Sequence, residues 1–184
     1  MNLKHLTTDE LTAGLGAIRQ SPATGGVLQM IVRRPSSGER ELLDEGQLDL
    51  VTGLVGDNWS TRGESATPKK VANIATQLTL MNSRAAQLIA GNRERWPLAG
   101  DQLYVDLDLG LANLPAGTRL AIGSALIEVT AEPHTGCKKF VERFGLDAMT
   151  FVNSPEGKKL CLRGINARVV EAGTIHLRDT VNKR

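Results

Sequence analysis

The sequence has few aromatic residues, few cysteines and no long apolar run. Only 3% of its 184 residues are Phe, Trp or Tyr, and 2 are Cys. No stretch approaches the roughly 18 to 20 apolar residues of a membrane span, and the first residues lack the apolar centre of a signal peptide. We therefore expect a cytoplasmic protein with reduced thiols and no membrane partner.

An excess of charge of one sign is also absent. The chain has 22 Lys and Arg against 20 Asp and Glu, a formal net charge of +2. This balance gives no basic field to hold a nucleic acid, so we expect no such partner. With no internal repeat or linker, the length predicts a single domain over residues 1–184, with a helical extension in residues 1–25 and the main domain in residues 26–182.

Most of the elements that the sequence predicts are short strands. Strands are expected at residues 26–34, 41–43, 77–80, 102–105, 120–122, 125–130, 166–170 and 174–177, most of them bounded by glycine or proline turns. Residues 46–70 are rich in turn formers and predict mostly irregular backbone, in a loop long enough to suggest a site or an interface.

Helix start and stop signals lie between these strands. Thr7 with Glu10 forms a capping box, Asn82 or Ser83 can cap a helix that Gly91 ends, and Ser154 precedes a first-turn proline. A further helix is expected from 137 to 144, ended by glycine at 145. The pattern predicts a mostly β fold with short helices (α+β), resembling a β-barrel.

The two cysteines lie in different surroundings. Cys137 follows a Pro/Gly loop and begins a helix beside Lys138, Lys139 and His134, where the helix dipole and the cations favour a thiolate that serves as nucleophile or metal ligand. The alternative for Cys137 is a buried small hydrophobe. Cys161 lies between two leucines, which favours a thiol packed in the core.

Other candidate sites are less compact. His134, Cys137, Cys161 and His176 are of the right types for a structural zinc site, although their spacing forms no compact motif. The serine-hydrolase G-x-S-x-G, the P-loop and the dinucleotide fingerprint are absent, so any phosphate would need scattered cations. The candidates are Arg62, Lys69, Lys70, Arg84 and Arg163. Trp59 and Trp96 either form the walls of a planar-ligand site or attach loops to the core.

An ordered set of short motifs resembles the MOSC family, the domain found at the C-terminus of molybdenum cofactor sulfurases. The matching pieces are residues 53–57, 77–81, Asn113-Leu114 with Gly117, 120–123 with 126–129, Cys137, and 163–169 with Gly173 and Asp179. They keep the family's order over about residues 26 to 182. Residues 58–64 depart from the family pattern and contain no histidine.

The resemblance implies a pyruvate-kinase-type β-barrel that binds molybdenum cofactor (molybdopterin). It implies that Cys137 is the molybdenum ligand, that Asn113 and Arg163 are pocket groups, and that Asp57 belongs to the pocket loop, while Arg62 is a candidate cofactor cation. His134 either donates a proton to the reacting oxygen or only orders its loop. The implied activity is reduction of N-hydroxylated small molecules with a separate redox partner. The alternatives are a carrier that holds a persulfide on Cys137 and a structural zinc domain.

Overall fold

The computed structural model describes residues 5–62 and 71–184, and in this part of the chain seven strands close into a barrel. The strands are β1 (Gly26–Arg33), β5 (Leu78–Asn82), β6 (Leu103–Asp106), β7 (Arg119–Ile122), β8 (Ala125–Val129), β9 (Ile165–Glu171) and β11 (Thr180–Lys183). They follow the order β11-β7-β8-β9-β5-β6-β1, and β1 pairs with β11 to complete the circle. The predicted mostly β barrel with short helices is confirmed.

Short strands extend this barrel. β2 (Glu41–Leu43) pairs with β1, and β3 (Glu45–Asp49), β4 (Gly53–Leu54) and β10 (Gly173–His176) form a separate three-stranded sheet. Part of the segment predicted to be irregular is therefore strand, because β3 and β4 pair with each other and β3 also pairs with β10, about 130 residues along the chain.

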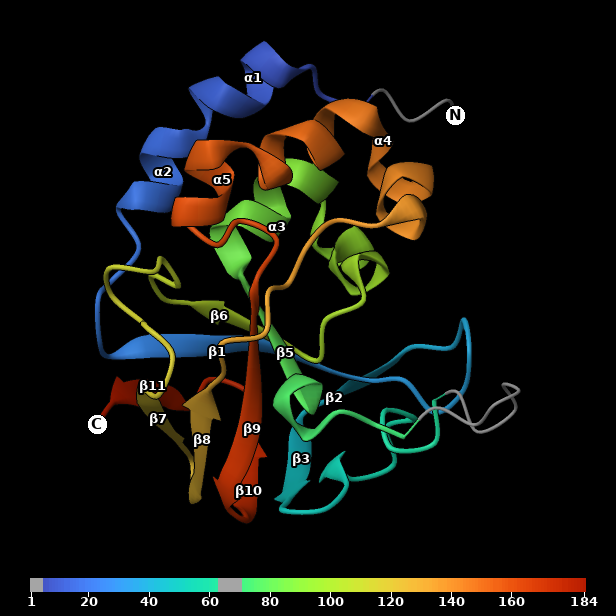
Figure 1. Cartoon of the computed structure of the whole chain (residues 1–184), viewed down its shortest axis with the longest axis vertical. Helices are drawn as coiled ribbons and strands as arrows, with labels where there is room; N and C mark the ends of the chain where they lie inside the picture. The colour runs from blue at the N-terminus through green and yellow to red at the C-terminus, as the bar shows by residue number, and fades with distance from the viewer. Residues whose placement is uncertain (1–4, 63–70) are drawn as a thin grey trace.

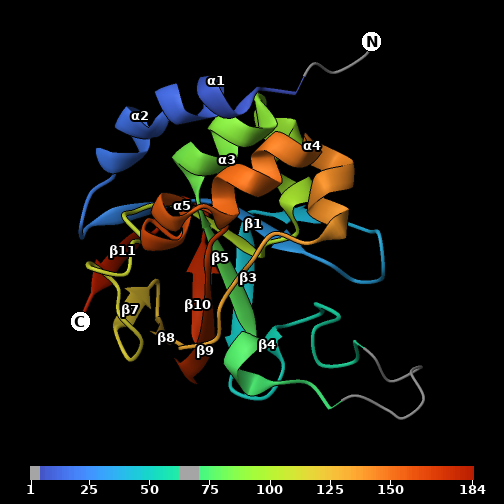
Figure 2. The same ribbon diagram turned by 45° about the horizontal axis from the view of Figure 1, so that its top comes forward.

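Helices lie on one side of the barrel, as Figures 1 and 2 show. They are α1 (Thr8–Ala13), α2 (Leu15–Arg19), α3 (Ser83–Ala90), α4 (Lys138–Asn153) and α5 (Pro155–Lys159), with short 3-10 turns η1 (Ile74–Thr76) and η2 (Arg93–Ala99). The parallel strands β5 and β6 are joined through α3 and η2, as a parallel pair requires a crossover connection.

The predicted helix caps are present in the structure. Thr7 and Glu10 make the capping box of α1, Asn82 caps α3, and Ser154 caps α5. Gly145 does break α4, with φ of 88°, but a second helical segment follows it to Asn153, which the sequence prediction missed.

Two apolar clusters hold these layers together. One fills the barrel interior, with members such as Leu28, Leu80 and Ile127. The other joins the outer faces of β1, β5 and β6 to the helices, with Met81 and Tyr104 as members. These strands read as nearly continuous apolar runs because both of their faces are buried. Within the described residues, the helices are all too short or too polar to cross a membrane.

Candidate functional site

The segment between β8 and α4 presents a cysteine at the surface. Thr130 fixes the start of the segment by donating to the carbonyls of Ala75 through Oγ1 (2.6 Å) and of Asn166 through its backbone N–H (2.9 Å). Its end carries Cys137, the N-cap residue of α4, whose side chain is exposed and makes no capping hydrogen bond. The thiol therefore lies free at a helix start, as the sequence predicted.

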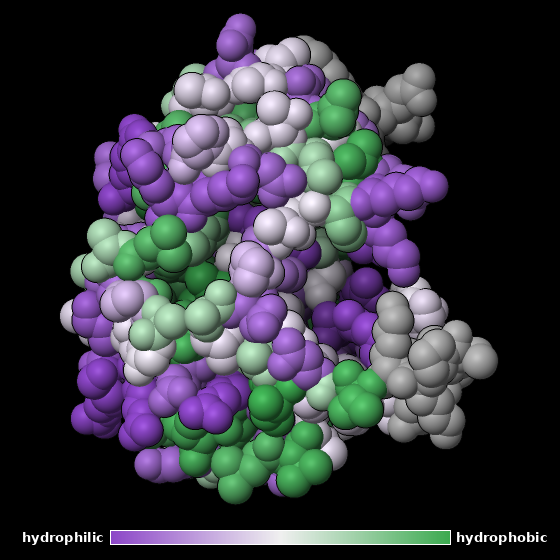
Figure 3. Space-filling view, in the orientation of Figure 1, coloured by the Kyte–Doolittle hydropathy of each residue, from purple (hydrophilic) through white to green (hydrophobic). Residues whose placement is uncertain are grey.

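The Cys137 side chain borders a cationic cavity of about 390 Å³. Besides Cys137, His134 and Thr135, this cationic cavity is lined by the side chains of six basic residues: Arg34, Arg40, Arg62, Lys139, Arg143 and Arg163. No carboxylate residue is among the described residues that line it. In Figure 3 strongly hydrophilic residues lie in a hollow between the helices and the barrel. A cavity of this composition favours an anion.

Arg34 is held rigidly at the end of β1. Its Nε and Nη2 donate to the two Asp57 carboxylate oxygens at 2.8 and 2.7 Å, and its Nη1 donates to the Gly100 carbonyl at 2.7 Å. Asp57 is buried and also accepts the backbone N–H groups of Arg34 and Trp59. Asp57 thus shapes the cavity through Arg34.

A buried carboxylate orders the opposite side of the cavity. Asp101 accepts from Arg163 Nη1 at 2.7 Å and from His134 Nε2 at 2.8 Å, and Arg163 Nη2 donates to the Ala99 carbonyl. Burial of Asp101 opposes its ionisation, but Arg163 and His134 outweigh it and hold the pKa of this carboxyl well below its usual range. Because an ionised carboxylate only accepts, His134 Nε2 carries the proton of this bond.

The remaining arginines crowd one another. Partial burial, followed by the charges of Arg143 and Arg34, lowers the pKa of Arg40. Desolvation and then Arg34 likewise lower the pKa of Arg62. Like charges held this close disfavour each other, so a bound anion would relieve the repulsion.

The structure brings four of the predicted site residues together. Cys137, His134, Arg62 and Arg163 all line the cationic cavity. Asn113 lies elsewhere, because its amide donates to the carbonyls of Ala23 and Asp108 while its oxygens accept from Lys183, and it is not among the described residues lining the cavity.

The other candidates are dispersed. Arg84 pairs with Asp106 at 2.7 Å beside α2, and Lys69 and Lys70 lie outside the described residues. Trp96 packs in the helical cluster, whereas Trp59 lines an adjoining cavity of about 600 Å³ that shares Arg34 and Arg62 with the cationic one.

The prediction of a zinc site formed by His134, Cys137, Cys161 and His176 is wrong, because these side chains do not come together. No group of three or more His, Cys, Asp or Glu side chains that could hold a metal ion forms within residues 5–62 and 71–184, a part of the chain that includes all four predicted ligands. His176 is exposed on β10 and pairs with Glu45 and Asp179, while Cys161 is partly buried against the barrel core.

Sequence reasoning missed half of the site. It did not single out Arg34 and Arg40, which lie between β1 and β2, or Arg143, which lies in α4. It also missed Asp101, which precedes β6. Only weak signals mark them, such as the position of Arg34 between a strand and Pro35. Their convergence depends on barrel closure and helix packing.

Comparison with known proteins supports the fold. No family model matches the chain, and no curated protein matches its sequence. YuaD from Bacillus subtilis is similar in structure, with a TM-score of 0.64 and 15% identity over 86% of this chain and 94% of that chain. YiiM from Escherichia coli has a TM-score of 0.55 and 19% identity, covering 86% and 69% of the two chains. YiiM from Geobacillus stearothermophilus has a TM-score of 0.58 and 13% identity, covering 86% of this chain and 75% of that chain.

The structural likeness to these proteins supports the barrel fold that the resemblance to MOSC domains implies. Identities this low support the fold alone.

Proposed function

We propose that this MOSC-fold chain binds molybdenum cofactor in the cationic cavity, with Cys137 as the protein ligand to molybdenum, and reduces N-hydroxylated small molecules. The observation that carries the proposal is the exposed Cys137 thiol on the same cavity as six basic side chains. A thiolate suits a soft metal centre, and the basic side chains suit the anionic phosphate of the pterin.

The donor set fits this group. The described lining offers an exposed thiol and six basic side chains with no carboxylate residue, which suits a soft metal centre beside an anionic phosphate. The paired residues Arg34 and Arg163 are positioned in advance by Asp57 and Asp101, whereas Arg40, Arg62 and Arg143 supply the charge that a phosphate would neutralise.

Each residue then has a distinct task. When bound, the cofactor supplies the electrons and the oxygen-accepting centre, and a separate redox protein must replenish those electrons. His134 is held through Nε2 by Asp101, which leaves Nδ1 as the ring nitrogen able to exchange a proton with substrate. Thr135 and Phe140 complete the lining of the cavity.

Metal analysis tests this proposal. Protein produced with molybdate in the medium is expected to contain stoichiometric molybdenum and pterin, and Cys137→Ala is expected to lose the molybdenum. Cys161→Ala is the matched control, because that thiol is not among the described residues lining the cationic cavity. Molybdenum retained equally in both variants, or absent from the parent protein, would contradict the proposal.

A persulfide carrier is the second candidate, favoured by the exposed thiol of Cys137, which lines the cationic cavity. In this case Cys137 holds a transferable sulfur for a partner enzyme without a bound metal. Cyanide-releasable sulfur in metal-free parent protein, lost in Cys137→Ala, would favour the carrier over the reductase.

A further inference from the structure

One largely buried hydroxyl lines the cationic cavity. Thr79 of β5 alternates with Leu78 and Leu80, whose side chains fill the barrel interior, so it lies on the outer face of the strand. It lines both the cationic cavity and the adjoining cavity of about 600 Å³, and it is 9% exposed. Because Oγ1 is the only polar atom of this side chain, any polar contact between the Thr79 side chain and an occupant of the cavity is made through the hydroxyl.

The side-chain amide of Gln102 next to it has a single allowed orientation. Its Oε1 accepts from the backbone N–H of Thr79 at 2.8 Å, and its Nε2 donates to the backbone carbonyl of Gln77 at 3.2 Å and to Asp57 Oδ1 at 3.4 Å. Gln102 is fully buried. Exchanging its two amide atoms would set donor against donor and acceptor against acceptor, so Oε1 must face Thr79.

This orientation fixes the hydroxyl proton of Thr79. Thr79 Oγ1 lies 2.6 Å from Gln102 Oε1. A carbonyl oxygen carries no hydrogen, so the hydroxyl donates this bond and only its lone pairs remain. No residue in the described part of the chain donates to Thr79 Oγ1. Thr79 can therefore only accept a hydrogen bond from an occupant of the cavity.

The charged side chains of the cavity have the opposite character. All six basic residues that line it carry donors and no acceptor. They attract any anion, whether or not that anion carries a hydrogen. An anion with an O–H group also satisfies Thr79, whereas an anion without hydrogen sets a negative oxygen against the lone pairs of Oγ1, and this difference discriminates between the two.

We propose that Thr79, oriented by Gln102, makes the cationic cavity selective for anions that carry a hydrogen-bond donor. The favoured class is a protonated oxyanion such as hydrogen phosphate, and the disfavoured class is an oxyanion of equal charge without hydrogen, such as sulfate. Thr79 determines the specificity, and Gln102 is a positioning residue that acts through it. The selectivity needs only the cationic cavity, so it does not depend on the proposed molybdenum cofactor.

Calorimetric titration with inorganic phosphate and with sulfate at about pH 8 tests this selectivity. Both ions are then tetrahedral and mostly doubly charged, but only phosphate has a hydroxyl. The full chain is produced in a host that makes no molybdopterin, so that the cavity can take the probe. The parent protein is expected to bind phosphate about tenfold more tightly than sulfate, the usual effect of a hydrogen bond to a charged group. Binding of neither ion, or equal or tighter binding of sulfate, would overturn the proposal.

Two substitutions of Thr79 separate the effect of the hydroxyl from that of side-chain shape. Thr79→Val keeps a branched side chain that suits a strand but removes the hydroxyl. It is expected to weaken phosphate binding about tenfold, while sulfate binding stays the same or becomes tighter. Thr79→Ser retains the hydroxyl and is expected to keep the preference for phosphate. Equal weakening of both ions in Thr79→Val would mean that the hydroxyl donates to either ion, and would overturn the assigned orientation.

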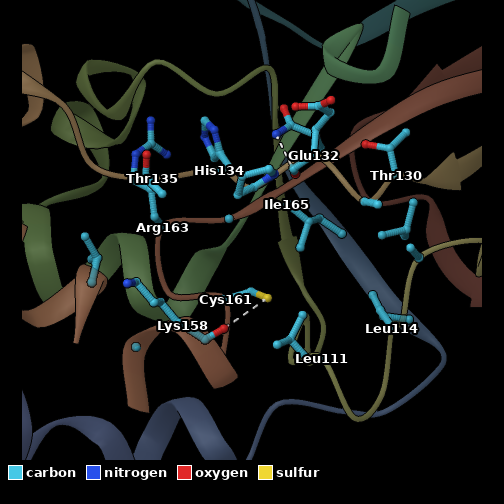
Figure 4. Close-up of a pocket in the computed structure, with 18 of the residues that line it drawn as sticks. Leu111, Leu114, Thr130, Glu132, His134, Thr135, Lys158, Cys161, Arg163 and Ile165 are labelled. Carbon is cyan, nitrogen blue, oxygen red and sulfur yellow. Dashed lines mark hydrogen bonds between the residues drawn. The ribbon is translucent and has the colours of Figure 1, made fainter. Parts of the chain in front are cut away.

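Thr135→Val is the matched control. Thr135 also lines the cationic cavity, and in Figure 4 it lies near Arg163 and His134. It is exposed, and its hydroxyl bonds to no other residue in the described part of the chain, so it can turn either its proton or a lone pair toward an ion. The substitution is expected to change both affinities by the same factor. A loss of selectivity equal to that of Thr79→Val would contradict the role of Gln102.

This proposal and the proposed function fail separately. Selective phosphate binding by a chain that takes up no molybdenum when molybdopterin is supplied would leave the role of Thr79 standing and remove the cofactor proposal. Stoichiometric molybdenum, lost in Cys137→Ala, together with equal binding of phosphate and sulfate would do the reverse.

Discussion

At the scale of single residues, Asp101 decides the geometry of the site. Its two oxygens hold Arg163 and His134, and its side chain is fully buried. Removing one member of a buried ionic group leaves the other charges unpaired, which is more costly than any surface change. Asp101 therefore orders the side of the cationic cavity that Arg163 and His134 form.

Asp101→Asn is expected to lower the free energy of unfolding at neutral pH by about 3 to 5 kcal/mol, because Arg163 loses its buried counter-charge. Since the folded pKa of Asp101 lies below its unfolded value, its stabilisation is complete above about pH 4 and is lost as the pH falls further. Urea unfolding of parent and variant across this range measures the difference, which is expected to narrow in acid. The exposed Asp44→Asn change serves as control, and a difference independent of pH would contradict this account.

At the scale of elements, the turn into β9 is the tightest constraint on the site. Gly164 follows Arg163 with φ of 113°, and a Cβ atom there would lie 2.3 Å from the Leu80 carbonyl oxygen of β5. Only glycine fits this backbone conformation and this close approach. The turn thereby fixes where Arg163 leaves the barrel.

Gly164→Ala is expected to destabilise the fold by about 2 to 4 kcal/mol through backbone strain and steric overlap with β5. Gly16→Ala is the opposite case, because a Cβ there meets no atom within 4 Å and alanine in a helix is expected to add about 0.5 to 1 kcal/mol. Chemical unfolding measures both effects. Similar stability of the two variants would show that the β5–β9 junction relaxes freely.

At the scale of the whole molecule, the N-terminal helices are part of the helical cluster. Leu11, Leu15 and Ile18 are buried against residues of α3 and α4, outside the barrel but continuous with its outer face. The helices thus share a core with the strands that carry the site.

Leu11→Ala is therefore expected to lower the free energy of unfolding by about 2 to 5 kcal/mol, the usual result of a cavity in a packed core. Circular dichroism and tryptophan fluorescence are expected to report one coincident unfolding transition, since both clusters share β1, β5 and β6. Leu146→Ala at an exposed position of α4 is the control. Early loss of the helical signal with an intact barrel would instead identify residues 1–25 as a separate unit.

Local chemistry in the sequence determined much of the fold. The helix caps at Thr7, Asn82 and Ser154 and the placement of Cys137 at a helix start were predictable, because each depends on residues within a few positions of one another. Most strands followed from short apolar patterns for the same reason. Composition, however, gave a net charge of only +2 and concealed the cationic cavity.

Tertiary structure alone decided the site. Asp101 and Arg163 form an ion pair although they are 62 residues apart in the sequence, and Arg34 and Asp57 do so at a separation of 23. The paired strands β3 and β10 are still further apart in the sequence. Such contacts exist only after β1 closes on β11 and the helices pack on the barrel, because burial and ionic pairing depend on distance in space and leave no periodic signal along the sequence.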